Sequence, residues 1–178
     1  MKQIFLCLAV SLWLFACNNE KKPEAVAGDS STKASVNLPY AASYSSSFEI
    51  GDPAHSATIL QGSWKDWELN KMENMKSWAA DTVVVYLSDA SVVRGVDSLQ
   101  ARWTRNRTAY TAVIDTISAV VPLRSTDKNQ NWVLVWATEI NTMPNGTKDT
   151  VYLMETWRMN KDGKADVLYQ YDRHVRKK

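Results

Sequence analysis

Glu155 is the side chain in this sequence whose setting most suggests chemistry. It lies in the segment 148–160, whose alternating pattern predicts a β-strand with an otherwise apolar face. The residues that share this face are Val151, Leu153, Trp157 and Met159. A carboxyl group in an apolar pocket has its pKa raised by desolvation, which is what a general acid or base near neutral pH requires. The structural alternative is that Glu155 pairs with an arginine or a tyrosine hydroxyl across the sheet.

Tryptophan is the second chemical signal. The chain has 8 tryptophans, and all except Trp13 lie beyond the first 16 residues. Aromatic rings form flat apolar walls for a ligand, but each can equally serve in the core or at a dimer surface. Trp157 shares the strand face of Glu155, and Trp78 ends a helix expected over that face. We therefore predict that Trp78 and Trp157 enclose a small, largely apolar ligand, with Tyr86 and Trp103 as further ligand-binding residues.

Several classes of function find no support. The sequence has no phosphate-binding glycine loop, no G-x-S-x-G motif, no H-E-x-x-H motif, and only two histidines, His55 and His174. We therefore predict no metal and no cofactor. The 21 Lys and Arg against 19 Asp and Glu give a net charge of +2, which is no basic field for nucleic acid.

The elements that position Glu155 begin with helices. Apolar residues at helical spacing predict one helix from Pro53, capped by Asp52, and a second helix that ends at Asp81, with a bend at 68–71. This stripe consists of Leu60, Trp64, Trp67, Met72, Met75 and Trp78. Strands follow at 82–86 and 92–93.

A third helix is expected at 96–110. Leu99 and Trp103 should face inward, four residues apart. Arg102, Arg105 and Arg107 should form a solvated outer face.

From Thr111 onward the pattern has a period of two, which predicts the four strands 111–122, 130–142, 148–160 and 164–174. Hairpin turns are expected at 144–146 and 161–164. Long strands joined by hairpins, with helices gathered before them, predict an α+β fold with a strongly bent antiparallel sheet. Its convex face should present Val133, Val135, Tyr152 and Met154 and form a homodimer, or bind another envelope component.

The N-terminal region predicts export. Met1-Lys2 precedes an apolar run from Ile4 to Phe15, and Leu14-Phe15-Ala16-Cys17 resembles a bacterial lipobox. We predict a signal peptide at 1–16, a lipidated Cys17 with a flexible tether over 17–50, and a folded domain at 51–178. An ordinary signal peptide or an uncleaved anchor is the alternative. Asn18, rather than Asp, follows Cys17, so we expect a lipid-anchored envelope protein of the bacterial outer membrane.

The order of elements resembles the nuclear transport factor 2-like superfamily, and within it the SnoaL-like group. Three segments carry the resemblance: Trp78–Tyr86 (WAADTVVVY), Arg94–Leu99 (RGVDSL) and Trp157–Lys164 (WRMNKDGK). Together they cover the chain from about residue 54 to residue 174. The resemblance implies a bent sheet wrapped around N-terminal helices that leaves a conical pocket.

The resemblance also implies positions for catalytic groups. Relatives place Asp or His in the cone for proton transfer, and the matching positions here are Asp81 at the mouth, Glu155, and Asp172 on the final strand. We take Glu155 and Asp172 as the candidate catalytic pair, but neither histidine lies where such a base is expected. The predicted function is therefore ligand binding or an interaction role. The alternative is a SnoaL-like enzyme that performs proton transfer, isomerisation or cyclisation on a hydrophobic carbonyl compound.

Overall fold

The computed structural model describes residues 39–175 of the 178-residue chain. The predicted signal peptide, the lipidated Cys17 and most of the predicted tether lie outside the described residues. Within residues 39–175, no helix is long and apolar enough to cross a membrane.

The N-terminal helix begins as predicted. Asp52 Oδ1 accepts a hydrogen bond of 2.8 Å from the backbone N–H of Ala54, and Pro53 occupies the first turn. The helix runs through α1 (Pro53–Thr58), the π-helical segment η1 (Ile59–Trp64) and α2 (Lys65–Glu68). It ends at the predicted bend, where Asn70 adopts a φ of 57°. A 3₁₀ turn, η2 (Met72–Asn74), and the short helix α3 (Met75–Trp78) follow.

The prediction that the second helix reaches Asp81 is wrong. Strand β2 (Ala79–Tyr86) starts directly after Trp78, and its Ala79 pairs with Ala165 of β7 (Ala165–His174). Ala79 is fully buried in this pairing. Tertiary pairing of the strand therefore overrides the helix propensity of the two alanines. Strand β3 (Val92–Arg94) and helix α4 (Val96–Arg107) come next, and α4 ends before the predicted Tyr110.

The remaining strands match the prediction to within a few residues. They are β4 (Ala112–Ser125), β5 (Gln130–Thr142), β6 (Lys148–Met159) and β7. The sheet has the order β1-β4-β5-β6-β7-β2-β3, with only the β2–β7 pair parallel among these described strands. Strand β1 (Phe48–Ile50) pairs with the end of β4, so the folded unit begins before the boundary expected at residue 51.

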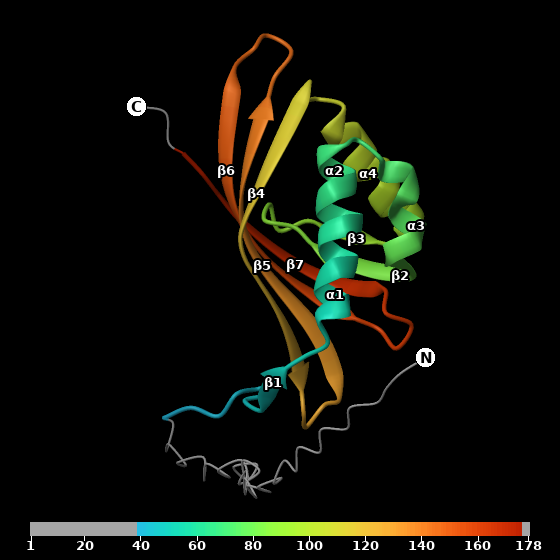
Figure 1. Cartoon of the computed structure of the whole chain (residues 1–178), viewed down its shortest axis with the longest axis vertical. Helices are drawn as coiled ribbons and strands as arrows, with labels where there is room; N and C mark the ends of the chain where they lie inside the picture. The colour runs from blue at the N-terminus through green and yellow to red at the C-terminus, as the bar shows by residue number, and fades with distance from the viewer. Residues whose placement is uncertain (1–38, 176–178) are drawn as a thin grey trace, which may run out of the picture. The chain divides into compact units, whose positions relative to one another are not determined.

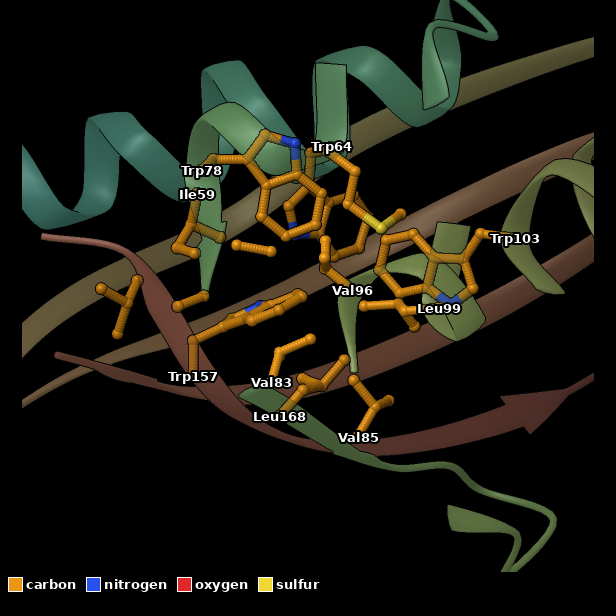
Figure 2. Packing of buried hydrophobic residues seen from close by; sticks show 14 of the residues in the cluster. Ile59, Trp64, Trp78, Val83, Val85, Val96, Leu99, Trp103, Trp157 and Leu168 are labelled. Carbon is orange, nitrogen blue, oxygen red and sulfur yellow. The ribbon is translucent and has the colours of Figure 1, made fainter. Parts of the chain in front are cut away.

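The helices lie on one face of a curved sheet, as the α+β prediction requires (Figure 1). The core between them is built on tryptophans. Trp78 packs edge-on against Trp157 at a centroid distance of 5.8 Å, and Trp103 lies 6.3 Å from Trp157. Figure 2 shows these rings above the aliphatic side chains of Val83 and Leu168.

Gly62 allows the helix to approach Trp78 closely. A Cβ at residue 62 would lie 2.6 Å from Cδ1 of the Trp78 indole, which is closer than van der Waals contact permits. The π-helical segment therefore packs directly on this ring.

The predicted convex face is partly wrong. Val133 lies opposite Trp157 and Val135 opposite Glu155, and both valines are fully buried on the helix-covered face. Directly opposite residues of an antiparallel pair share a face, so the valines must lie with Trp157 and Glu155. Tyr152 and Met154 are exposed as predicted, and Trp136 lies beside Met154 on this outer face.

Candidate functional site

A cavity of about 350 Å³ lies between the helices and the concave face of the sheet. Three tryptophans, Trp64, Trp67 and Trp103, form its helical wall. Its strand wall includes Glu139, Asn141, Leu153, Glu155 and Gln170. Asp89, Arg102, Asp172 and His174 also line it, and we call these four the mouth.

Glu155 is buried in the strand wall. Its Oε2 accepts a hydrogen bond of 2.9 Å from Trp157 Nε1, and its Oε1 accepts one of 2.9 Å from Gln170 Nε2. Neither donor is the arginine or tyrosine of the structural alternative. Burial raises the pKa of Glu155 to about 7, against the opposing effect of these two hydrogen bonds. Glu155 is thus a carboxyl group that changes protonation near neutral pH at a cavity wall.

Glu139 and Asn141 are cavity residues that the sequence prediction missed. Asn141 Nδ2 donates a hydrogen bond of 2.6 Å to Glu139 Oε1, and both side chains are buried. Burial raises the pKa of Glu139 as well. The sequence does contain a pattern that indicates Glu139. It shares an apolar strand face with Val133, Val135 and Ala137, and Glu155 lies on a similar apolar face of its own strand.

Besides Glu139 and Glu155, the concave face has a third carboxyl group, that of Asp115. Asp115 of β4 is directly opposite Glu139 in the register, and neither of its carboxylate oxygens has a hydrogen-bond partner within the described part of the chain. Burial raises the pKa of Asp115 to about 8, and the charges of Glu139, Glu68 and Glu155 add to this effect. Three acids of the concave face therefore act on one another electrostatically.

Arg107 holds the helical wall in place, and the prediction that it is solvated is wrong. Its side chain is 5% exposed. It donates from Nε to the carbonyl oxygen of Trp67 (2.7 Å), from Nη2 to that of Glu68 (3.0 Å) and from Nη1 to that of Tyr110 (3.0 Å). These bonds tie the end of α2 to the end of α4. The tie accompanies an edge-on contact between Trp67 and Trp103, with centroids 5.9 Å apart.

The side chains of the mouth are paired with one another or with neighbours. Arg102 Nη2 lies 2.9 Å from Asp89 Oδ2, and Asp172 accepts a hydrogen bond from the Ser88 hydroxyl. His174 Nδ1 lies 3.0 Å from a carboxylate oxygen of Asp149, and its Nε2 lies 3.9 Å from Asp172 Oδ1. The structure thus brings Asp172 to the same cavity as Glu155. It also brings His174 to the cavity, where neither histidine was expected.

The four predicted ligand-binding residues have different positions. Trp103 lines the cavity. Trp78 and Trp157 are 2% and 0% exposed and belong to the core behind it. Tyr86 stacks on Tyr169 at a centroid distance of 4.9 Å and alternates with the buried Val85, so it lies on the opposite face of the sheet. Asp81 is exposed and is not among the residues that line the cavity.

Comparison with known proteins by sequence finds no matching family profile and no matching curated protein. Comparison by structure finds clear similarity of fold. The Δ5-3-ketosteroid isomerase of a Mycobacterium species aligns with a TM-score of 0.55 and 21% identity over 68% of this chain and 98% of that one. A Mycobacterium tuberculosis protein in complex with estradiol-17β-hemisuccinate aligns with a TM-score of 0.54 and 18% identity, covering 66% of this chain and 92% of that chain.

A third similar structure comes from Catenulispora acidiphila. It has a ketosteroid isomerase-like fold and was solved in complex with trimethylamine. It aligns with a TM-score of 0.54 and 13% identity over 68% of this chain and 86% of that chain. At these identities the similarity establishes the fold, and the fold is the one that the sequence resemblance implied.

Proposed function

From the nuclear transport factor 2-like fold of this chain, we propose that it is a membrane-anchored envelope protein whose cavity binds a small, largely apolar ligand. The observation that carries the proposal is the cavity itself, in which three tryptophans face a buried, ionisable Glu155. Most ligand sites combine an apolar wall with a few polar groups that fix orientation. Similar structures solved with a steroid ester and with trimethylamine support ligand binding by this fold.

The tryptophan wall sets the expected affinity. At about 25 cal/mol per Å², covering roughly 300 Å² of apolar surface contributes about 7 kcal/mol before the cost of association. A dissociation constant of 1 μM corresponds to a net gain of about 8 kcal/mol, so a purely apolar ligand should bind more weakly than 1 μM, and polar contacts must supply the difference for any tighter ligand.

Intrinsic tryptophan fluorescence tests the binding proposal. The full-length chain is titrated with fractions of apolar and of polar metabolites. We expect apolar fractions to change the emission, and Trp67→Ala to weaken this response at least fivefold. Trp136→Ala is the matched control, because Trp136 lies on the outer face of the sheet and is 37% exposed. A response to polar anions alone, unchanged in Trp67→Ala, would contradict the proposal.

A second candidate function, proton transfer, is favoured by the raised pKa of Glu155. As a carboxylate, Glu155 would remove a proton from the carbon next to a carbonyl group of a hydrophobic compound, and as the acid it would return that proton to another carbon. Asp172, which lines the same cavity, is the second candidate catalytic carboxylate. Deuterium uptake by cyclohex-2-enone in D₂O, followed by NMR, tests this function. Uptake that is faster than in buffer and is lost in Glu155→Gln but not in Glu49→Gln would support it, and uptake at the buffer rate would exclude it for this probe.

The lipid anchor is a proposal that rests on Leu14-Phe15-Ala16-Cys17 and on Asn18 after it. We expect the mature chain to begin at an acylated Cys17 and to fractionate with the outer membrane. Mass spectrometry of the mature N-terminus measures this directly, with Cys17→Ser as the control that should lack the lipid mass. A free N-terminus downstream of Cys17 in the wild-type chain would refute the anchor.

A homodimer through the outer face of the sheet is the remaining part of the proposal. Trp136, Met154 and Tyr171 are directly opposite one another on β5, β6 and β7, and all three are exposed. Light scattering should give twice the monomer mass, and Met154→Lys should halve it. The control Leu69→Lys, at an exposed apolar residue of the turn after α2, should leave the mass unchanged. A monomeric wild-type chain would instead favour another envelope component as the partner of this face.

A further inference from the structure

The strand wall of the cavity contains carboxyl groups that form no ion pair with a basic side chain of the described residues. Glu139 and Glu155 line it, Asp115 lies beside Glu139, and none of the three has an ion-pair partner among the described residues. Carboxylates that are removed from water are normally paired with a positive group. A ligand that carries such a group would complete this part of the cavity.

The basic side chains near the cavity are already engaged. Arg102 pairs with Asp89, and His174 contacts Asp149. Arg107 lies close enough to Glu139 to lower its pKa, but its guanidinium donates to three backbone carbonyl groups instead of to a carboxylate.

Asn141 supplies an independent sign of a missing donor. Its side chain is 2% exposed and lines the cavity, and its Oδ1 accepts no hydrogen bond from any residue that the structure describes. Oδ1 is the free atom because Nδ2 donates to Glu139. Buried acceptors of this kind are nearly always satisfied in proteins, so a ligand with N–H donors fits this position.

Two N–H donors of the cavity also lack an acceptor in the described part of the chain, but they do not require a ligand with a carbonyl group. The indole nitrogens of Trp64 and Trp67 have no hydrogen-bond partner among residues 39–175. Trp64 nevertheless lowers the pKa of Glu155, and Trp67 lowers that of Glu139, so each indole N–H lies near a carboxyl group of the chain. Both tryptophans line the cavity, and aromatic rings attract a cation through their quadrupole.

We infer that the ligand of this cavity carries a protonated amine, whose ammonium group binds Glu139 and Asn141 near Glu155 and whose apolar body packs on Trp64, Trp67 and Trp103. This inference rests on the proposed function, because it names the chemical class of the small, largely apolar ligand. A primary or secondary ammonium group fits best, since it offers N–H donors to the carboxylate and to Asn141 Oδ1 at the same time.

Isothermal titration of the full-length chain with a matched pair of probes tests the inference. 2-Phenylethylamine, which is protonated at pH 7, and 2-phenylethanol share one apolar body and differ in the polar group. We expect the amine to bind at least tenfold more tightly than the alcohol. Glu139→Gln should remove most of this tenfold preference and leave the alcohol affinity unchanged. Glu49→Gln, an exposed glutamate of β1, is the control and should affect neither probe.

The outcomes separate this inference from the proposed function. Equal affinities for the two probes would overturn the amine inference and leave a ligand-binding cavity. Binding of neither probe, together with no fluorescence response to apolar fractions, would overturn the proposed function as well. If Glu139→Gln does not fold, as judged by circular dichroism, the wild-type preference and the variant Glu155→Gln decide in its place.

Discussion

The strand wall and the mouth of the cavity use the same residue types under opposite conditions. In the strand wall, burial raises the pKa of Glu139 and of Glu155, and no basic side chain of residues 39–175 forms an ion pair with either. At the mouth, the Ser91 hydroxyl and backbone N–H lower the pKa of Asp89, with a further contribution from Arg102. The mouth therefore satisfies its own charges, whereas the strand wall is complete only with a ligand or a proton. What a carboxyl group contributes to function in this cavity therefore depends on whether neighbouring side chains of the protein pair with it.

Two arginines of helix α4 give the largest expected contrast. Arg107→Ala leaves three backbone carbonyl groups near the cavity without their donor, and we expect it to lower the free energy of unfolding by roughly 3–5 kcal/mol. Arg102→Ala removes only a partly exposed ion pair at the mouth and should cost less than about 1 kcal/mol. Urea denaturation of both variants measures the difference. Equal effects would show that Arg107 does not hold the wall together.

Glu155 should make stability depend on pH in the direction opposite to that of an ordinary ion-paired acid. Its pKa is about 7 in the folded chain against 4.5 for an unperturbed glutamate, so the folded state binds the extra proton between these pH values. Stability should therefore fall as the pH rises from about 4.5 to 7, by about 3 kcal/mol in all.

The variant Glu155→Gln isolates this effect, because glutamine keeps the shape and removes the ionisation. We expect the variant to lose the pH dependence in that window and to be more stable than wild type at pH 8, by thermal unfolding. Asp172→Asn at the mouth is the comparison and should change stability by less than about 1 kcal/mol. A Glu155→Gln variant that is less stable than wild type at pH 8 would mean that the ionised carboxylate is well accommodated.

Asp89 should show the smallest effect, with the opposite sign. Because its pKa is lowered, its contribution to stability is present above the unfolded value of 3.8 and is lost as the pH falls through the folded value. Asp89→Asn should therefore differ from wild type at neutral pH and become indistinguishable from it in strong acid. Acid titration of the two proteins, followed by circular dichroism, checks the sign, and a difference that grows in acid would contradict it.

The alternation of residues along the strands predicted Glu155 in the strand wall but not Glu139 and Asn141. Alternation divides the residues of a strand into two faces, but it does not say which face is covered. Glu155 was found because its own face is apolar. Glu139 and Asn141 were missed because Val133 and Val135, on the same face of β5, were assigned to the outer surface. The pairing of Thr142 with Lys148 next to the hairpin fixes the register and places these residues with Glu155.

Other positions depend on contacts that no local pattern contains. Arg107 looks like part of a solvated charged face, but Trp67, whose carbonyl oxygen it binds, lies 40 residues earlier in the chain. Trp78 and Trp157 were predicted to enclose the ligand, yet they lie in the core, because an apolar face does not show which of its residues adjoin a cavity. The order of elements and the α+β class, in contrast, follow from local periodicity and turn residues, which the sequence shows directly.

We propose that the ligand binds in the tryptophan-lined cavity, and the indole N–H signals of the chain test this placement. These signals are assigned by Trp→Phe substitution and followed in ¹H–¹⁵N spectra during titration with 2-phenylethylamine. We predict that the signals of Trp64, Trp67 and Trp103 shift and saturate together, while those of Trp132 and Trp136 on the other face of the sheet stay in place. Shifts confined to Trp132 and Trp136, with the three cavity tryptophans unchanged, would contradict the claim.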